Sequence, residues 1–172
     1  MSTEAKNGKL RSSLVTWPAI IVGLMIGRYT GINLLIPLAG AAITFYVLKK
    51  FGPPQKAYWF PAISVQTGHA IWFIVGLAIL GQLNANILDP AFLLLGSLWL
   101  FLKPGTVPVC VLSVLQFAVL AYNAYIFAGT AFGTSANEAL TVHIIFRALA
   151  IGLMIFALIV SWRKNQGVAS VP

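Results

Sequence analysis

The chain has 172 residues, of which 59% are hydrophobic and only 8% are charged. Because a soluble domain carries about 25% charged residues, this composition excludes an ordinary water-soluble fold. The formal net charge of +8 would suit a nucleic-acid-binding protein, but the basic residues stand at the ends of apolar stretches, where membrane topology explains them. We therefore expect an all-α, polytopic helical membrane protein whose immediate partner is the lipid bilayer and which binds no nucleic acid.

Six apolar stretches follow a polar and basic N-terminal segment, residues 1–13. The first stretch lacks a small-x-small cleavage pattern at its end and is interpreted as a retained span. A helix needs about 20 residues to cross a hydrocarbon core of about 30 Å, so the third, fifth and sixth stretches are long enough, whereas the first and fourth are clearly short. The predicted six-helix domain covers residues 14–162 and leaves a C-terminal tail, residues 163–172. The six stretches are residues 14–27, 32–48, 61–83, 87–102, 107–128 and 139–162.

Helix-capping residues support two of these boundaries. Asp89 followed by Pro90 is typical of an N-cap and the first helical position. Ser135 and Glu138, three residues apart, fit a capping box that opens the sixth helix. We therefore expect the side chains of Asp89 and Ser135 to hold the first turns of the fourth and sixth helices.

The basic residues indicate how the helices are oriented. With six spans and both termini in the cytoplasm, nine of the eleven Lys and Arg residues fall on the cytoplasmic side, as the positive-inside rule requires. Tyr58 and Trp59 then fit an aromatic belt at this interface. A four-span alternative would bury Arg28 and Lys103 in hydrocarbon at roughly 2.5–3.5 kcal/mol each. The sequence therefore favours six spans in a bacterial inner (plasma) membrane, with cytoplasmic N- and C-termini.

The two halves of the chain, residues 14–83 and 87–162, resemble each other weakly. A Thr-x-His motif recurs at an offset of 74, so the only two histidines of the chain, His69 and His143, occupy matching positions. Three spans in each half would force the halves to insert in opposite directions, which gives a 3+3 inverted repeat of the kind found in many transporters. Chance similarity between two apolar sequences is the alternative.

Polar residues inside the predicted spans are candidates for lining a path across the membrane, because such residues are costly in lipid and often mark a functional site. The alternative is that each one forms a hydrogen bond between helices, worth about 0.6–2 kcal/mol. The candidates are Gln66 and His69 in the third span, Gln116 and Asn123 in the fifth, where Ser113 shares their face, and His143 and Arg147 in the sixth.

Arg147 lies near the middle of the sixth span and stays charged, so it needs a counter-charge or a polar ligand. The chain has three acidic residues, Glu4, Asp89 and Glu138. Asp89 and Glu138 are the available ion-pair partners, and contact with an anionic or polar solute is the functional alternative. No carboxylate lies in the middle of a span, which argues against a proton-driven pump.

Two histidines on separate spans also raise the hypothesis of a bis-histidine haem. His69 lies about three residues to the cytoplasmic side of its predicted midpoint, and His143 lies about seven residues to the external side of its own. At 1.5 Å per residue, the two would be roughly 15 Å apart along the membrane normal, too far for one haem iron. We therefore expect no cofactor and no bound metal. The lack of a nucleophile–base pair predicts that the chain is not an enzyme.

These features together favour a small membrane transporter or channel for a small neutral or anionic solute. The competing hypothesis is a non-catalytic membrane subunit, which would be a scaffold or substrate-binding component of a larger membrane complex. Partner subunits or a homo-oligomer would then surround the chain. Small size and short loops suit both hypotheses.

Overall fold

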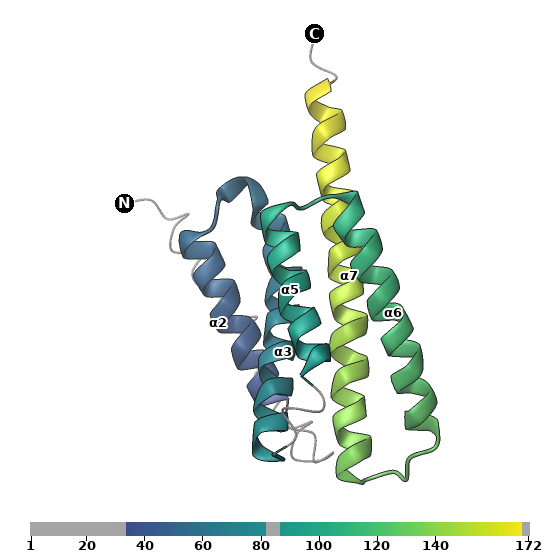
Figure 1. The fold of residues 1–172 in the computed structure, drawn as a ribbon. Helices are drawn as coiled ribbons and strands as arrows, with labels where there is room; N and C mark the ends of the chain where they lie inside the picture. Colours follow the sequence, from purple (N-terminus) through teal and green to yellow (C-terminus); the bar gives the residue numbers. More distant parts are fainter. Residues whose placement is uncertain (1–33, 82–86, 170–172) are drawn as a thin grey trace, which may run out of the picture.

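The computed structural model describes residues 34–81 and 87–169, and all regular structure within these residues is helical (Figure 1). This confirms the all-α prediction. The predicted N-terminal tail and the first predicted span, residues 14–27, lie outside the described residues. The helices are α2 (Leu35–Phe51), the 3-10 helix η1 (Pro54–Trp59), α3 (Phe60–Ile79), α5 (Leu88–Leu102), α6 (Thr106–Ala128) and α7 (Ser135–Ala169).

Three helical segments are long and apolar enough to cross a membrane: Pro54–Ile79, Thr106–Ala128 and Ser135–Lys164. They support an integral membrane protein. Helix α5 is apolar but has only 15 residues, which extend about 22 Å and fall short of a hydrocarbon core of about 30 Å.

Four helices form a closed ring, and α2 lies outside it. Helix α3 packs against α5 and α7, and α6 packs against the same two helices. Helix α2 packs on α3, on the far side from α7 and α6 (Figure 1). This contact is close because a β-carbon added at Gly68 would collide with the backbone of Pro37 and Ala41. Small residues allow such an approach between membrane helices, where backbone packing replaces the hydrophobic effect.

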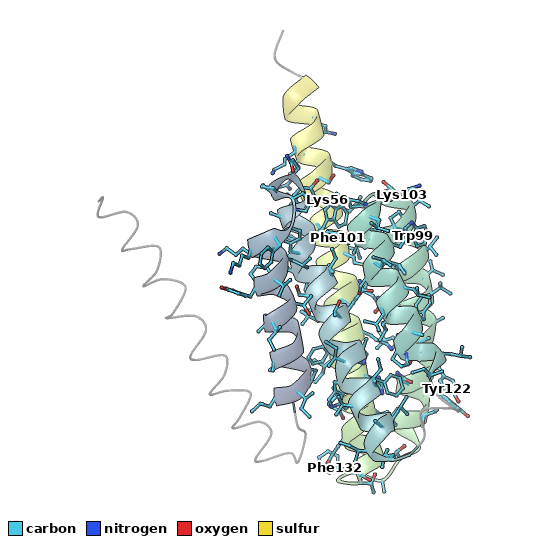
Figure 2. The ribbon with its side chains drawn as sticks, turned by 60° about the vertical axis from the view of Figure 1, so that its left-hand side comes forward. Lys56, Trp99, Phe101, Lys103, Tyr122 and Phe132 are labelled. Atoms are coloured by element: carbon cyan, nitrogen blue, oxygen red, sulfur yellow. The ribbon has the colours of Figure 1, made fainter. Side chains whose placement is uncertain are left out.

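The two ends of the bundle differ in charge. Figure 2 shows Lys56 and Lys103 at one end and Phe132 at the other. Lys56 donates to the carbonyl oxygens of Phe101 (2.7 Å) and Leu102 (3.1 Å), so its ammonium group satisfies the last turn of α5. We call this end the basic end and the opposite one the acidic end. Among the described residues, the basic end carries Lys49, Lys50, Lys56, Lys103, Arg163 and Lys164, and the acidic half carries Asp89 and Glu138.

An apolar core fills the ring near the basic end. Trp59 belongs to it and is only 1% exposed, so its ring faces the interior of the bundle rather than the lipid. The physical reason is the 3-10 turn η1, which packs against α3 and α7 and places the indole inside the bundle. We call this cluster the apolar plug; its members are Trp59, Ala62, Ile63, Leu100, Val109, Leu112, Met154 and Ala157.

Several helix boundaries differ from those predicted. The third helical segment covers residues 54–79 rather than 61–83. It begins early because η1 leads directly into α3, and it ends early because Gly81 turns the chain with a φ of 65°. Helix α7 starts at Ser135, four residues before the predicted start, and continues to Ala169.

Both predicted caps are also corrected. The hydroxyl of Thr134, one residue before Ser135, accepts the backbone N–H of Asn137 at 3.3 Å and caps α7. Asp89 lies inside the first turn of α5, whose N-cap Ile87 has no side-chain cap. The Asp89 carboxylate is therefore not a cap, and it has a different partner, described below.

Candidate functional site

His69 and His143 meet directly inside the ring. Nε2 of His69 on α3 lies 2.8 Å from Nδ1 of His143 on α7, and both side chains are buried. One ring must donate an N–H to the lone pair of the other, so the pair shares one proton along this contact. The predicted separation of roughly 15 Å is therefore wrong.

The error came from the assumed midpoint of the third span. With the segment at Pro54–Ile79, the midpoint of the third span moves from residue 72 to between residues 66 and 67. Each histidine therefore lies on the acidic side of the midpoint of its own helix. The distances of the two histidines from these midpoints still differ by about four residues, or about 6 Å. The midpoints of the two helices therefore do not lie in one plane. The depth argument against haem is thereby removed, and the expectation of no cofactor stays a prediction.

The histidine contact is too short to enclose a metal ion as it stands. Two metal–nitrogen bonds of about 2.0–2.1 Å laid end to end need about 4 Å, whereas the two ring nitrogens are 2.8 Å apart. Within the described part of the chain, no group of three or more His, Cys, Asp or Glu side chains could hold a metal ion.

Aromatic rings surround the histidine pair. The ring centroids of His69 and Phe146 are 5.7 Å apart, and those of His143 and Trp72 are 5.1 Å apart. Phe73 packs edge-on against His143 at 4.4 Å. The pair therefore lies in an apolar environment, where its hydrogen bond is protected from water.

Arg147 forms an ion pair with Asp89 of α5. Its Nη2 donates to both carboxylate oxygens of Asp89 at 2.5 Å. The Arg147 side chain is 0% exposed and that of Asp89 is 29% exposed, so the pair connects the interior with the surface. Asp89 also sits in the first turn of α5, where the helix dipole favours a negative charge. Of the two partners predicted for Arg147, the structure selects Asp89 and not Glu138.

This ion pair shows that α5 begins part of the way along the bundle axis rather than at the acidic end. Arg147 lies twelve residues after the start of α7, about 18 Å along the helix, yet it reaches the second residue of α5. Figure 1 shows the same stagger: α5 stops well short of the acidic ends of α3, α6 and α7. A short helix whose N-terminus points into a membrane protein is a common device for binding polar solutes.

The interior also holds polar atoms that have no hydrogen-bond partner among residues 34–81 and 87–169. We call the residues that carry them the buried polar cluster. Native proteins leave few such atoms, because each costs roughly 1–3 kcal/mol when it is removed from water. The atoms are Oγ of Ser64, Oε1 of Gln66, Oγ of Ser113, Oε1 and Nε2 of Gln116, and Nε and Nη1 of Arg147.

Three members of the cluster lie at one level of the bundle. Gln116 is twelve residues before the end of α6 and Arg147 twelve residues after the start of α7, so they are level on these antiparallel helices. Gln66 precedes His69 by three residues and Arg147 follows His143 by four, which puts both about one turn closer to the basic end than the histidine contact. Gly96 of α5 lies at the same level, because a β-carbon added to it would stand 3.7 Å from Oε1 of Gln66.

All six polar residues singled out from the sequence are buried in the structure. The fold places Gln66, Gln116 and Arg147 at one level of the bundle. It also brings His69 into hydrogen-bond contact with His143. Asn123 stands apart, seven residues nearer the acidic end than Gln116 on the same helix, so the two share a face of α6. Whether these residues line a path stays a prediction.

Sequence reasoning missed Ser64 and Gly96. Ser64 is a polar residue in an apolar stretch, two positions before Gln66, and the same criterion that selected Gln66 could have found it. Gly96 has no side chain, and only its position beside Gln66 and Leu112 in the folded bundle distinguishes it from other glycines.

No protein-family model, curated protein or solved structure matches this chain. Functional interpretation therefore rests on the geometry of the interior.

Proposed function

We propose that this protein is a small membrane transporter or channel, with six spans and both termini at the basic end, that passes a small uncharged polar solute. The observation that supports this most is the buried polar cluster. In a membrane protein built only for stability, apolar residues would fill these positions at lower free energy. A solute or water that moves through the ring would satisfy the same atoms in passing.

The Asp89–Arg147 ion pair narrows the class of solute. An isolated buried guanidinium would favour an anion, but Asp89 already supplies the opposite charge. A second anion near Arg147 would add an uncompensated charge in a low-dielectric interior, which is costly. Between the neutral and anionic solutes expected from the sequence, the ion pair favours the neutral one.

The exposure pattern supports an entrance at the acidic end. Asp89 is 29% exposed and contacts the fully buried Arg147, so charged groups extend from the surface of the bundle to the cluster. Toward the basic end the apolar plug closes the ring. This arrangement fits a conformation that is open to one side of the membrane.

Contacts around the histidines support the inverted repeat. At the offset of 74, His69 matches His143 and Trp72 matches Phe146. His69 contacts Phe146 while His143 contacts Trp72, which is the reciprocal pattern that a two-fold relation produces. The outer helices agree, since α2 packs on α3 as α6 packs on α7.

The substitution Gln116→Leu tests the proposal. The full chain is reconstituted into liposomes, and the entry of glycerol and urea is followed by light scattering. We expect wild-type protein to accelerate entry over empty liposomes and Gln116→Leu to lose most of that acceleration. Because Gln116 makes no hydrogen bond, the variant should be as stable as wild type or more stable by about 1–3 kcal/mol.

Phe117→Leu is the matched control, because it introduces the same residue at the neighbouring, lipid-exposed position of α6. It should leave flux unchanged. Full flux through Gln116→Leu would refute the proposed route. Wild-type protein that passes no solute, and that purifies with a stoichiometric membrane partner, would instead support the competing role as a subunit.

A further inference from the structure

We propose that Gln66, Gly96, Gln116 and Arg147 form a binding site for a small uncharged carbonyl compound of the amide or urea type. Each of the four ring helices contributes one of these residues, at one level. The inference rests on the proposed function, in that the solute bound here is the one that passes. It goes further by assigning the site and the chemical class of its ligand.

The donors at this level come mainly from Arg147. A guanidinium has five N–H groups. Asp89 takes up Nη2, and the remaining nitrogens, Nε and Nη1, are buried with no partner. They carry three N–H groups, and each can donate to an acceptor such as the carbonyl oxygen of a ligand.

The acceptors come from the two glutamines. Nε2 of Gln66 is held by the sulfur of Met154 at 3.4 Å, which leaves Oε1 of Gln66 as its free atom. Oε1 of Gln116 is likewise buried and unpaired. Both oxygens need an N–H or O–H donor. A ligand that carries a carbonyl oxygen and an N–H₂ group on one small frame satisfies Arg147 and the glutamines together.

Packing at Gly96 and the charge of the ion pair set further conditions. Gly96 places no side chain at this level, and a β-carbon there would stand 2.7 Å from Cδ2 of Leu112. The Leu112 side chain therefore packs directly against the Gly96 backbone, and a larger residue at position 96 would displace it. The ion pair makes the site neutral overall, so an uncharged ligand enters without a charge penalty.

Side-chain NMR of the full chain in detergent micelles tests this site without measuring transport. The chain has four arginines, and replacing Arg11, Arg28 and Arg163 by Lys leaves Arg147 as the only source of a guanidinium Nε–H signal. Acetamide is the probe. We expect its addition to shift the Arg147 Nε–H resonance in a saturable manner, at millimolar concentrations because so small a ligand binds weakly.

Two reference compounds and one variant define the specificity. 2-Propanol has a similar size but no carbonyl, and it should produce no saturable shift. Formate should bind more weakly than acetamide because of its charge. In a Gln116→Leu background, the acetamide concentration at half-saturation should rise at least fivefold, since the glutamine partner is lost.

The outcomes separate this inference from the proposed function. If acetamide gives no saturable shift while liposomes still pass urea or glycerol, the site assignment is wrong and the transport function stands. If acetamide binds but no solute passes, the site stands and the transport function falls. Saturation by formate without saturation by acetamide would overturn the uncharged-ligand assignment.

Discussion

Asp89 and Arg147 carry opposite charges at one contact, but their environments differ. The Asp89 side chain is 29% exposed, whereas that of Arg147 is fully buried. Losing Asp89 leaves a buried, unpaired guanidinium. We expect Asp89→Asn to destabilise the folded protein by about 3–5 kcal/mol, the usual cost of breaking a buried ion pair from one side. Unfolding by heat or SDS in mild detergent measures it.

Glu138→Gln is the control, because this substitution also removes a carboxylate charge. Glu138 lies near the N-terminus of α7 and does not contact Arg147. It should cost less than about 1 kcal/mol, the range of a helix-dipole contact. The double variant Asp89→Asn with Arg147→Gln should recover part of the lost stability, since no charge stays buried. Equal losses for Asp89→Asn and Glu138→Gln would mean that Arg147 has another partner.

For single residues, the burial of polar side chains was easier to predict from the sequence than the residues that they contact. Gln66, Gln116 and Arg147 stand out because polar residues are rare in apolar stretches, and all are buried. The histidine contact was missed because depth was measured from the midpoints of apolar runs, and composition does not mark where a helix begins. The partner of Arg147 depended on where α5 starts inside the bundle, which only tertiary packing decides.

The contact between α2 and α3 depends on Gly68. A β-carbon there would lie 2.9 Å from Cα of Ala41 and closer still to other backbone atoms, which cannot move as a side-chain tip can. We expect Gly68→Ala to destabilise the protein by about 1–3 kcal/mol through this overlap. Chemical or thermal unfolding in detergent measures the change.

Gly76→Ala, on the same helix, is the matched control. A β-carbon at Gly76 meets nothing within 4 Å, so this substitution should stabilise α3 by up to about 1 kcal/mol through helix propensity. If Gly68→Ala were as stable as Gly76→Ala, α2 would not pack on α3 as closely as the structure indicates.

Among the elements, the sequence predicted the existence of helices well and their ends less well. The fifth predicted stretch, residues 107–128, agrees with α6 to within one residue because a basic turn and a glycine bound it. The third was displaced by the 3-10 turn η1, whose aromatic and basic composition resembles an interfacial loop. The early end of α3 depends on the left-handed conformation of Gly81, one of several glycines that the sequence does not distinguish.

For the whole molecule, charge and packing are arranged along one axis. Six of the seven Lys and Arg residues of the described chain lie at the basic end, with Arg147 the exception, and the positive-inside rule predicted that clustering from the sequence. The sequence did not indicate the second asymmetry, in which the unpaired polar atoms lie on the acidic side of the apolar plug. It depends on which side chains the packing brings together, and the sequence does not give this packing.

This asymmetry predicts which end of the ring admits water. In a Cys110→Ala background, a thiol introduced as Asn123→Cys should react with a water-soluble reagent supplied on the acidic side. Asn123 is 8% exposed and shares the face of α6 that carries Gln116. A thiol introduced as Ala157→Cys, inside the apolar plug, should react from neither side.

Gln55→Cys provides the reference for the basic side, because Gln55 is exposed in η1 and should react only there. Vesicles of both orientations then assign each reaction to one face of the membrane. Rapid labelling of Ala157→Cys from the side that labels Gln55→Cys would show that the ring is open at the basic end. Protection of Asn123→Cys from both sides would mean that the buried polar cluster is sealed, and its unpaired atoms would then be satisfied by trapped water rather than by a passing solute.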